Sequence, residues 1–264
     1  MRSLWLQEAL GSAEEDAPRL GGDDKADVCI VGGGYTGLWT ALRLKEHDPA
    51  LDVVIVEADV CGGGPSGRNG GFVLSWWAKF AKFEHILGAE EALRLCHASA
   101  SAVADIGEYC TANGIDAHFR HDGWLWAATS EAQIGAWDET VQAIEGHGVE
   151  AFVRLEPEEV ARRAGSPTHL AGVLEPTGAT VQPALLARGL RRDGAARTPR
   201  SSATRRSPRA SRAGCTVAPV RTGCACGCHS RSGFWLGRSG RTPEPMPRPE
   251  LKCSEVTPDP VHRS

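Results

Sequence analysis

The sequence predicts an α/β fold: a strand–helix–strand unit near its start, a mixed α+β region after it, and a largely irregular C-terminal tail. Val28–Val31 and Val53–Val56 are short apolar runs, and between them Leu38, Ala41, Leu42 and Leu44 recur at helical spacing. Short apolar runs bounded by turn residues are typical of buried strands in a parallel sheet. Further helical patterns and short strand-like runs follow from residue 89, which favours a second, α+β region.

The remaining elements follow in chain order. Residues 1–24 are polar and acidic, and we expect Leu4–Leu6 to pin them to the fold. Asp122-Gly123 is a typical tight-turn pair and predicts a hairpin over residues 119–128. Helices are expected over residues 38–47, 89–112 and 134–146, from 156 onward and from 183 to about 193, with strand pieces at 172–174 and 179–181.

These elements divide the chain into five parts. The predicted parts are an N-terminal extension (1–24), a βαβ domain with a second glycine loop (25–85), a partial second domain (86–176), a helix returning to the first domain (177–191) and a tail (192–264).

The first glycine cluster, Gly32-Gly33-Gly34-Tyr35-Thr36-Gly37, has the form G-x-G-x-x-G. It follows a strand and opens a helix, and Glu57 ends the next strand. This context is that of a dinucleotide-binding fingerprint, in which phosphates meet the helix N-terminus. Glu57 can accept hydrogen bonds from ribose hydroxyls, and its charge disfavours the 2′-phosphate of NADP. The alternative is a glycine turn in an ordinary α/β protein.

A second glycine-rich loop covers Gly62–Gly71 and includes Ser66 and Arg68. We expect its backbone amides and guanidinium to lie near the same crevice. A bulky flavin needs such a second wall, whereas a simple NAD site usually does not, so the loop favours FAD. The alternative is a surface loop with one arginine.

Ala26–Leu38 followed by Gly62–Phe72 resembles the FAD-dependent amine oxidoreductases of the D-amino-acid oxidase superfamily. The gamma-glutamylputrescine oxidoreductase-like branch is the most similar, because Ser3–Leu6, Gly123–Leu125 and Gly178–Pro183 also resemble it. The resemblance covers residues 3–191. It implies bound FAD, a Rossmann-like FAD domain, a sheet-based substrate domain, and oxidation of a small-molecule amine by hydride transfer to flavin N5.

The resemblance also implies a set of FAD contacts. These are Gly32, Gly34, Thr36 and Gly37 around the pyrophosphate, Glu57 at the adenosine ribose, Ser66 and Arg68 near the phosphates or ribityl chain, and Asn69, Gly70 and Gly71 beside the flavin ring. Gly33 and Tyr35, in the same cluster, are also expected to be cofactor-binding. It assigns no catalytic acid or base. His85, His97 and His118 are expected at the surface or in packing. Trp76-Trp77 either pack in the core, as we expect, or line a substrate cavity.

The tail differs sharply from the rest of the chain. Residues 192–264 hold 14 basic and 5 acidic residues and only nine Leu, Ile, Val, Met, Phe or Trp, whereas the remainder holds 15 basic and 28 acidic residues. We interpret the tail as the product of a frameshift or truncation that leaves activity doubtful; the alternative is a genuine disordered basic tail. Its arginines suit no specific nucleic-acid site, and the close spacing of Cys224, Cys226, Cys228 and His229 disfavours a metal site.

No apolar run reaches the roughly 20 residues of a membrane span. The N-terminus is acidic from Glu8 and does not resemble a signal peptide. Cys29, Cys61, Cys96 and Cys110 have no framework spacing and are expected to be reduced thiols of a cytoplasmic protein. Two functions therefore remain: an FAD-dependent amine oxidoreductase, or a non-enzymatic nucleotide-binding remnant.

Overall fold

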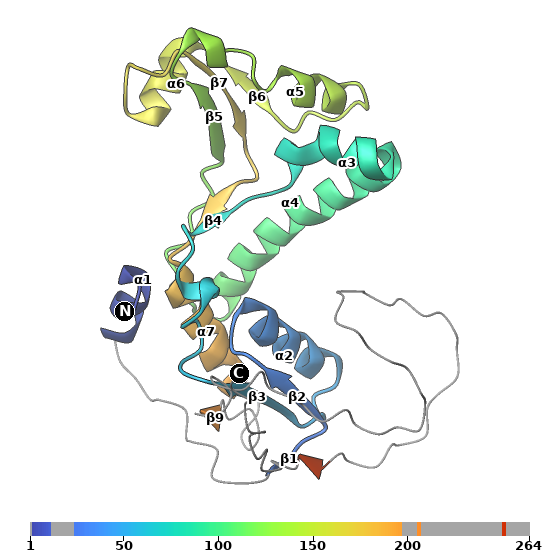
Figure 1. Ribbon diagram of the computed structural model, residues 1–264, viewed down its shortest axis with the longest axis vertical. Helices are drawn as coiled ribbons and strands as arrows, with labels where there is room; N and C mark the ends of the chain where they lie inside the picture. Colours follow the sequence, from blue (N-terminus) through green and yellow to red (C-terminus); the bar gives the residue numbers. More distant parts are fainter. Residues whose placement is uncertain (1, 12–23, 197–204, 207–249, 252–264) are drawn as a thin grey trace, which may run out of the picture. The chain divides into compact units, whose positions relative to one another are not determined.

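The computed structural model describes residues 2–11, 24–196, 205–206 and 250–251 (Figure 1). The chain divides into two compact units, residues 1–14 with 62–193 and residues 15–61 with 194–264. Helices and strands both contribute, so the predicted α/β class is confirmed.

The predicted strand–helix–strand unit is present in the second of these units. Strand β2 (Val28–Val31) leads through the glycine cluster into helix α2 (Tyr35–His47) and then strand β3 (Val53–Glu57). β2 and β3 are parallel, with Val28 opposite Val53. The helix buries Leu38, Ala41 and Leu42, which is the apolar face that the sequence predicted.

Two features of this sheet differ from the prediction. β2 is half-buried rather than buried, and Val31 is 48% exposed, because in the described part of the chain β2 pairs only with β3. β3 also pairs in parallel with β9 (Arg205–Arg206), and β1 (Asp24–Lys25) pairs with β10 (Glu250–Leu251). Strand pairing uses backbone groups, so these short strands need no apolar pattern. The rest of the predicted tail lies outside the described residues.

The other unit holds the remaining elements. They are helix α1 (Leu4–Gly11), 3-10 turn η1 (Pro65–Gly67), β4 (Phe72–Val73), η2 (Trp77–Lys79), α3 (Phe80–Leu87), α4 (Ala89–Ala112), β5 (Trp124–Ala128), η3 (Glu131–Gln133), α5 (Asp138–Glu145), β6 (Val153–Leu155), α6 (Pro157–Ala164), β7 (Ala171–Glu175), β8 (Ala179–Thr180) and α7 (Pro183–Ala196). The last three residues of α7 belong to the unit of residues 15–61 and 194–264.

A core lies between helices α3, α4 and α5 and the antiparallel sheet β5-β7-β6 (Figure 1). Trp77 and Phe80 lie at its centre and are 3% and 0% exposed, with Cys96, Ile144 and Val173 around them. Burial of one such large apolar side chain contributes about 1.5–3 kcal/mol. Trp77 therefore packs in the core, as expected.

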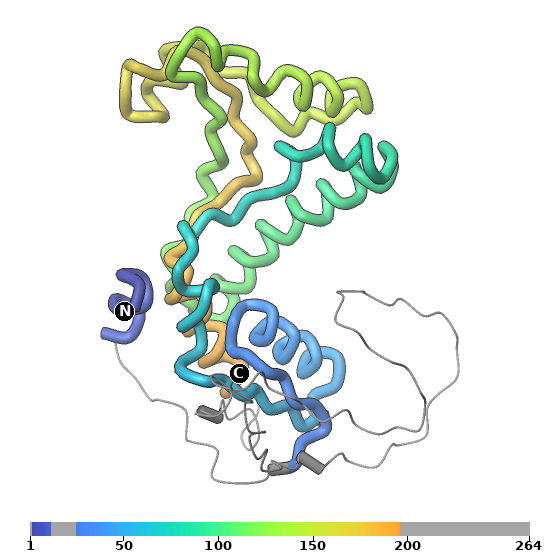
Figure 2. Tube along the Cα trace, viewed as in Figure 1, coloured from blue at the N-terminus to red at the C-terminus, as the bar shows by residue number. Residues whose placement is uncertain are grey.

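The predicted hairpin over residues 119–128 is wrong. Arg120 pairs with Thr180, and Trp124 pairs with Glu175, so both arms lie along the segment from β7 to β8 instead of along each other. Figure 2 shows the two chain segments running side by side. Gly123, with φ of +83°, makes the bend between the arms. β5 pairs with β7 along its whole length, and both strands contribute to the core. These contacts stabilise the observed pairing more than a short local turn would stabilise a hairpin.

Two predicted helices have different ends in the structure. α5 begins at Asp138 rather than near Ile134, because Gly135 has φ of +82° and interrupts the helix; Ile134 is 51% exposed. α7 continues past Asp193 to Ala196, since alanine is a strong helix former. α4 and the start of α6 match the prediction.

Candidate functional site

The glycine cluster makes the turn between β2 and the N-terminus of α2. Gly32 has φ of +104°. Its N–H donates to the carbonyl of Val56, in β3, at 2.8 Å, so it extends the β2–β3 pairing by one hydrogen bond. Gly34 occupies the N-cap position, where no side chain of the described residues caps the helix, and the first turn holds no acid. A helix start of this kind suits an anion, since its amides and dipole favour negative charge.

Gly37 keeps the helix close to the strand. A Cβ at this position would collide with the Gly32 carbonyl oxygen and lie 3.2 Å from Cγ2 of Ile30. Gly33 is equally constrained, because a Cβ there would collide with the Cys61 sulfur. The glycines at 33 and 37 are therefore required by the packing of the turn itself.

Glu57 is tied directly to this turn. Its Oε2 accepts the backbone N–H of Gly33 at 2.7 Å, and its Oε1 accepts the N–H of Asp59 at 3.0 Å. The side chain is half-buried. Each carboxylate oxygen can accept a further hydrogen bond, so Glu57 can still receive hydroxyl donors.

These residues fit the adenosine diphosphate part of FAD. The helix start has no acid in its first turn and no side-chain cap among the described residues, which suits the pyrophosphate, and the fixed carboxylate suits ribose hydroxyls. The N–H of Gly33 is bonded to Glu57.

The second glycine loop folds around the 3-10 turn η1. The Asn69 side chain donates to the carbonyls of Pro65 and Ser66, at 3.2 and 2.9 Å, and accepts the N–H of Gly71 at 2.8 Å. Asn69 therefore shapes the loop with its own side chain. Arg68 is exposed and Ser66 half-buried, so both can meet a ligand.

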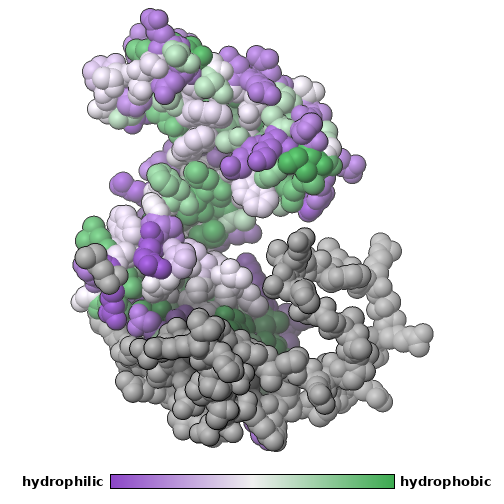
Figure 3. Space-filling model, in the orientation of Figure 1, coloured by the Kyte–Doolittle hydropathy of each residue, from purple (hydrophilic) through white to green (hydrophobic). Residues whose placement is uncertain are grey.

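An apolar stripe follows this loop. Phe72, Leu74 and Trp76 alternate along the chain and are 69%, 40% and 46% exposed. Figure 3 shows an apolar area over β4, where Phe72 lies. Trp76 packs edge-on against Phe83, with ring centroids 5.5 Å apart. Of the Trp76-Trp77 pair, only Trp76 is thus accessible.

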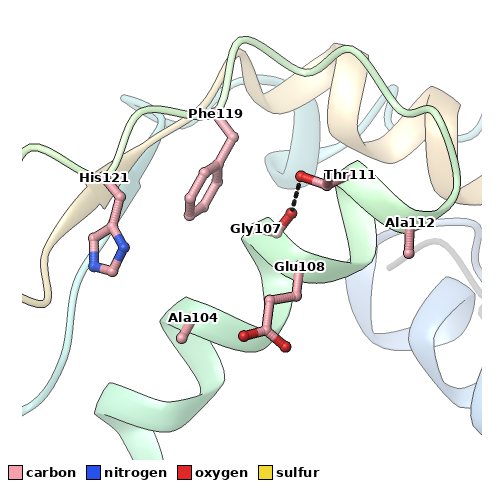
Figure 4. Close-up of a pocket in the computed structure, with 7 residues that line it drawn as sticks. All are labelled: Ala104, Gly107, Glu108, Thr111, Ala112, Phe119 and His121. Atoms are coloured by element: carbon pink, nitrogen blue, oxygen red, sulfur yellow. Dashed lines mark hydrogen bonds between the residues drawn. The ribbon is translucent and has the colours of Figure 1, made fainter.

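A pocket of about 460 Å³ lies elsewhere in the same unit, between α4 and the segment before β5 (Figure 4). Phe119 faces α4 across it, and Glu108 and His121 lie on its rim. Sequence analysis singled out none of its lining residues. It contains none of the predicted FAD-binding residues.

The other candidate chemical groups are structural. Burial raises the pKa of Cys96 to about 11 and also raises the pKa of Cys110, so neither thiol is a ready nucleophile. His97 packs edge-on against Trp77, 4.9 Å between centroids. Among the described residues, Cys29, Cys61, Cys96 and Cys110 form no disulfide with one another. The described residues hold no group of three or more His, Cys, Asp or Glu side chains that could bind a metal ion, and the tail cysteines lie outside those residues.

Comparison with known proteins decides the family. A family model described as FAD dependent oxidoreductase matches residues 27–249. The chain belongs to this family. The predicted superfamily and its cofactor, FAD, are thereby confirmed. The match continues past residue 191, where the sequence analysis ended the resemblance.

Three relatives place the chain more closely. Gamma-glutamylputrescine oxidoreductase of Escherichia coli (strain K12) is 32% identical over 164 residues, 62% of this chain and 38% of that protein. Probable oxidoreductase OrdL of Rhizobium meliloti (strain 1021) is 32% identical over 180 residues, 67% of this chain and 41% of that protein. The crystal structure of glycine oxidase from Geobacillus kaustophilus covers 65% of this chain and 45% of its own, at 23% identity and a TM-score of 0.51, which shows a shared fold.

The chain therefore spans about two fifths of the length of the curated relatives it matches. Among the described helices, none has the length and apolar character needed to cross a membrane.

Proposed function

We propose that the chain binds FAD and serves the oxidation of a primary or secondary amine. The observation that carries the proposal is the Glu57 carboxylate, which the N–H of Gly33 ties to the glycine turn at the start of α2. In this proposal Gly34, Tyr35 and Thr36 present backbone amides to the pyrophosphate, and Glu57 accepts the ribose hydroxyls. Ser66, Arg68 and the backbone of Asn69, Gly70 and Gly71 contribute to holding the rest of the cofactor.

When bound, FAD supplies a hydride acceptor at N5. The chain's own residues then bind and orient. Arg68 is always protonated and exposed, so it offers a positive charge to a phosphate. The exposed Phe72, Leu74 and Trp76 offer an apolar surface that excludes water from the flavin ring. No side chain is assigned a proton transfer.

Relatives support an amine as the substrate class. The names of two of them refer to gamma-glutamylputrescine and to glycine, which both carry an amino group on a carbon that bears hydrogen. We further propose that the chain as written oxidises amines slowly, on the ground of the core-poor composition of residues 192–264. A nucleotide-binding remnant without turnover is the second candidate, favoured by the same composition.

The experiment has two parts. The purified full chain is titrated with FAD, ADP, AMP and 2′,5′-ADP, and binding is followed calorimetrically. FAD and ADP should bind, and 2′,5′-ADP should bind at least about tenfold more weakly than AMP, which differs from it only by the 2′-phosphate, because Glu57 repels that phosphate. Equal binding of AMP and 2′,5′-ADP would contradict the assignment.

The second part measures chemistry. FAD-loaded chain is mixed without oxygen with gamma-glutamylputrescine, glycine and sarcosine, and bleaching of the yellow flavin is followed. Bleaching by an amine supports the oxidoreductase, at a rate below the usual enzymatic range of about 1–10³ s⁻¹ if the chain is impaired. FAD binding without bleaching by any amine favours the remnant.

A further inference from the structure

Helix α1 is bonded to the second glycine loop through one side chain. The Ser3 hydroxyl oxygen accepts the N–H of Leu6 at 3.2 Å, which caps the helix, and the same hydroxyl donates to the Gly67 carbonyl at 2.6 Å. Leu6 and Ala9 are 1% and 4% exposed, so the apolar face of α1 is buried. Ser3 therefore joins a docked helix to the loop.

Gln182 fastens the other side of α1. Its Nε2 donates to the Trp5 carbonyl at 2.9 Å, and its Oε1 accepts the N–H of Leu185 at 2.8 Å. The side chain is 4% exposed. A buried amide with both ends bonded holds a defined orientation, so Gln182 links α1 to the first turn of α7.

The second glycine loop also contacts α7 and the residues just before α7. A Cβ at Gly62 would lie 2.8 Å from Cβ of Ala187, and one at Gly67 would lie 3.4 Å from Cβ of Ala184. At its far end, the Gly71 carbonyl accepts the N–H of Val181 at 2.8 Å. The loop is thus fixed at its two ends, and Ser3 adds the bond in its middle.

We propose that Ser3 and Gln182 are positioning residues for FAD, which they serve by holding the second glycine loop in its binding conformation. The inference rests on the proposed function. Gly67 stands between Ser66 and Arg68, so fixing the Gly67 peptide fixes the directions in which both side chains leave the backbone. A loop ordered beforehand loses less entropy when the cofactor binds.

Ser3 offers an unusually clean test, because its two hydrogen bonds can be separated. Ser3→Asp keeps a good helix cap but has no hydrogen to donate to Gly67. Ser3→Thr keeps both functions. We expect Ser3→Asp to weaken FAD binding about 2–10-fold, as for loss of one hydrogen bond, with ADP binding unchanged. Ser3→Thr should bind FAD as the native chain does. The matched control for the added charge is Ser101→Asp, at an exposed position of α4.

Gln182 provides an independent arm. Gln182→Glu retains an oxygen for Leu185 but loses the donor to Trp5 and to Glu8 Oε2, which lies 3.4 Å from Nε2, and it sets a second carboxylate beside Glu8. It should therefore weaken FAD binding at least as much as Ser3→Asp, again with ADP binding unchanged. Because both residues act through the same helix, the double variant should lose no more FAD affinity than the more affected single variant. Such non-additive losses are the signature of coupled sites.

A second measurement follows the loop directly. Arg68 is exposed, and Ser3→Asp should speed tryptic cleavage after Arg68 while leaving cleavage after Arg94 on α4 unchanged. Native FAD affinity and native Arg68 cleavage in Ser3→Asp would overturn the inference, and so would an equal loss of FAD and ADP binding. If the native chain binds neither nucleotide, the proposed function fails and the inference with it; if ADP binds normally and only the FAD effect is absent, the inference alone fails.

Discussion

The backbone N–H of Gly33 donates to the Glu57 carboxylate at 2.7 Å, which ties the end of β3 to the turn that starts α2. The acid thus supports the glycine turn and at the same time remains the group best placed for ribose hydroxyls. Glu57 therefore has two roles, support of the turn and binding of the ribose, and different substitutions of Glu57 affect the two roles differently.

Glu57→Gln should weaken ADP binding about tenfold and Glu57→Ala about a hundredfold. Gln keeps an oxygen for the Gly33 N–H but loses the charge, whereas Ala loses both, and hydrogen bonds to a charged group contribute about 1.5–3 kcal/mol. Glu57→Gln should also narrow the preference for AMP over 2′,5′-ADP, because the repulsion of the 2′-phosphate is gone. Calorimetric titration measures both effects, with exposed Glu90→Gln as the control. An unchanged nucleotide preference in Glu57→Gln would contradict the assigned role.

Gly37→Ala should destabilise the chain by about 1–3 kcal/mol, as expected for overpacking, and abolish FAD binding. The added Cβ collides with the Gly32 carbonyl, which is backbone and cannot move without opening the turn. Gly64→Ala is the matched control, because a Cβ there meets nothing within 4 Å. Urea unfolding followed by circular dichroism gives the comparison. Equal stability of the two variants would show that close packing at Gly37 is unimportant.

Much of this site could be predicted from local pattern. The strand–helix–strand unit has two apolar runs, a helical repeat and glycines at fixed spacing, all within 31 residues of one another, and each element formed where expected. The error at Asp122-Gly123 has the opposite origin. The turn signal is local, but the partners of β5 lie about 47 residues further on, in β7, and no local pattern shows them.

The positioning residues were missed for the same reason. Ser3 bonds to Gly67, 64 residues away, and Gln182 bonds to Trp5, 177 residues away. A serine before an apolar run does predict a helix cap. Nothing in its neighbourhood indicates that its hydroxyl also donates to a distant loop.

Phe80→Ala should lower the free energy of unfolding by about 3–5 kcal/mol, the usual cost of removing a fully buried aromatic ring. Phe80 is 0% exposed at the centre of the core between α3, α4, α5 and the β5-β7-β6 sheet. Phe72→Ala is the control, since Phe72 is 69% exposed and its loss should change stability by less than about 0.5 kcal/mol. Chemical denaturation of both variants tests the placement of the core, which fails if Phe72→Ala is the more damaging change.

Stability should fall in alkaline solution because of Cys96. Burial disfavours the thiolate and raises the pKa of Cys96 from 9.0 to about 11 in the folded chain. A raised folded pKa means that the unfolded chain loses its proton first, so the contribution of this thiol is complete below pH 9 and is lost as pH rises from 9 to about 11. Cys96→Ala should remove this part of the pH dependence, at the cost of a small cavity. Unfolding free energies at pH 8 and at pH 10.5 give the slope for each chain; if the native chain and Cys96→Ala lose stability equally over this interval, the thiol is not the group responsible. Iodoacetamide at pH 8 offers a second measurement, because a thiol with so high a pKa should be alkylated far more slowly than free cysteine until the chain unfolds.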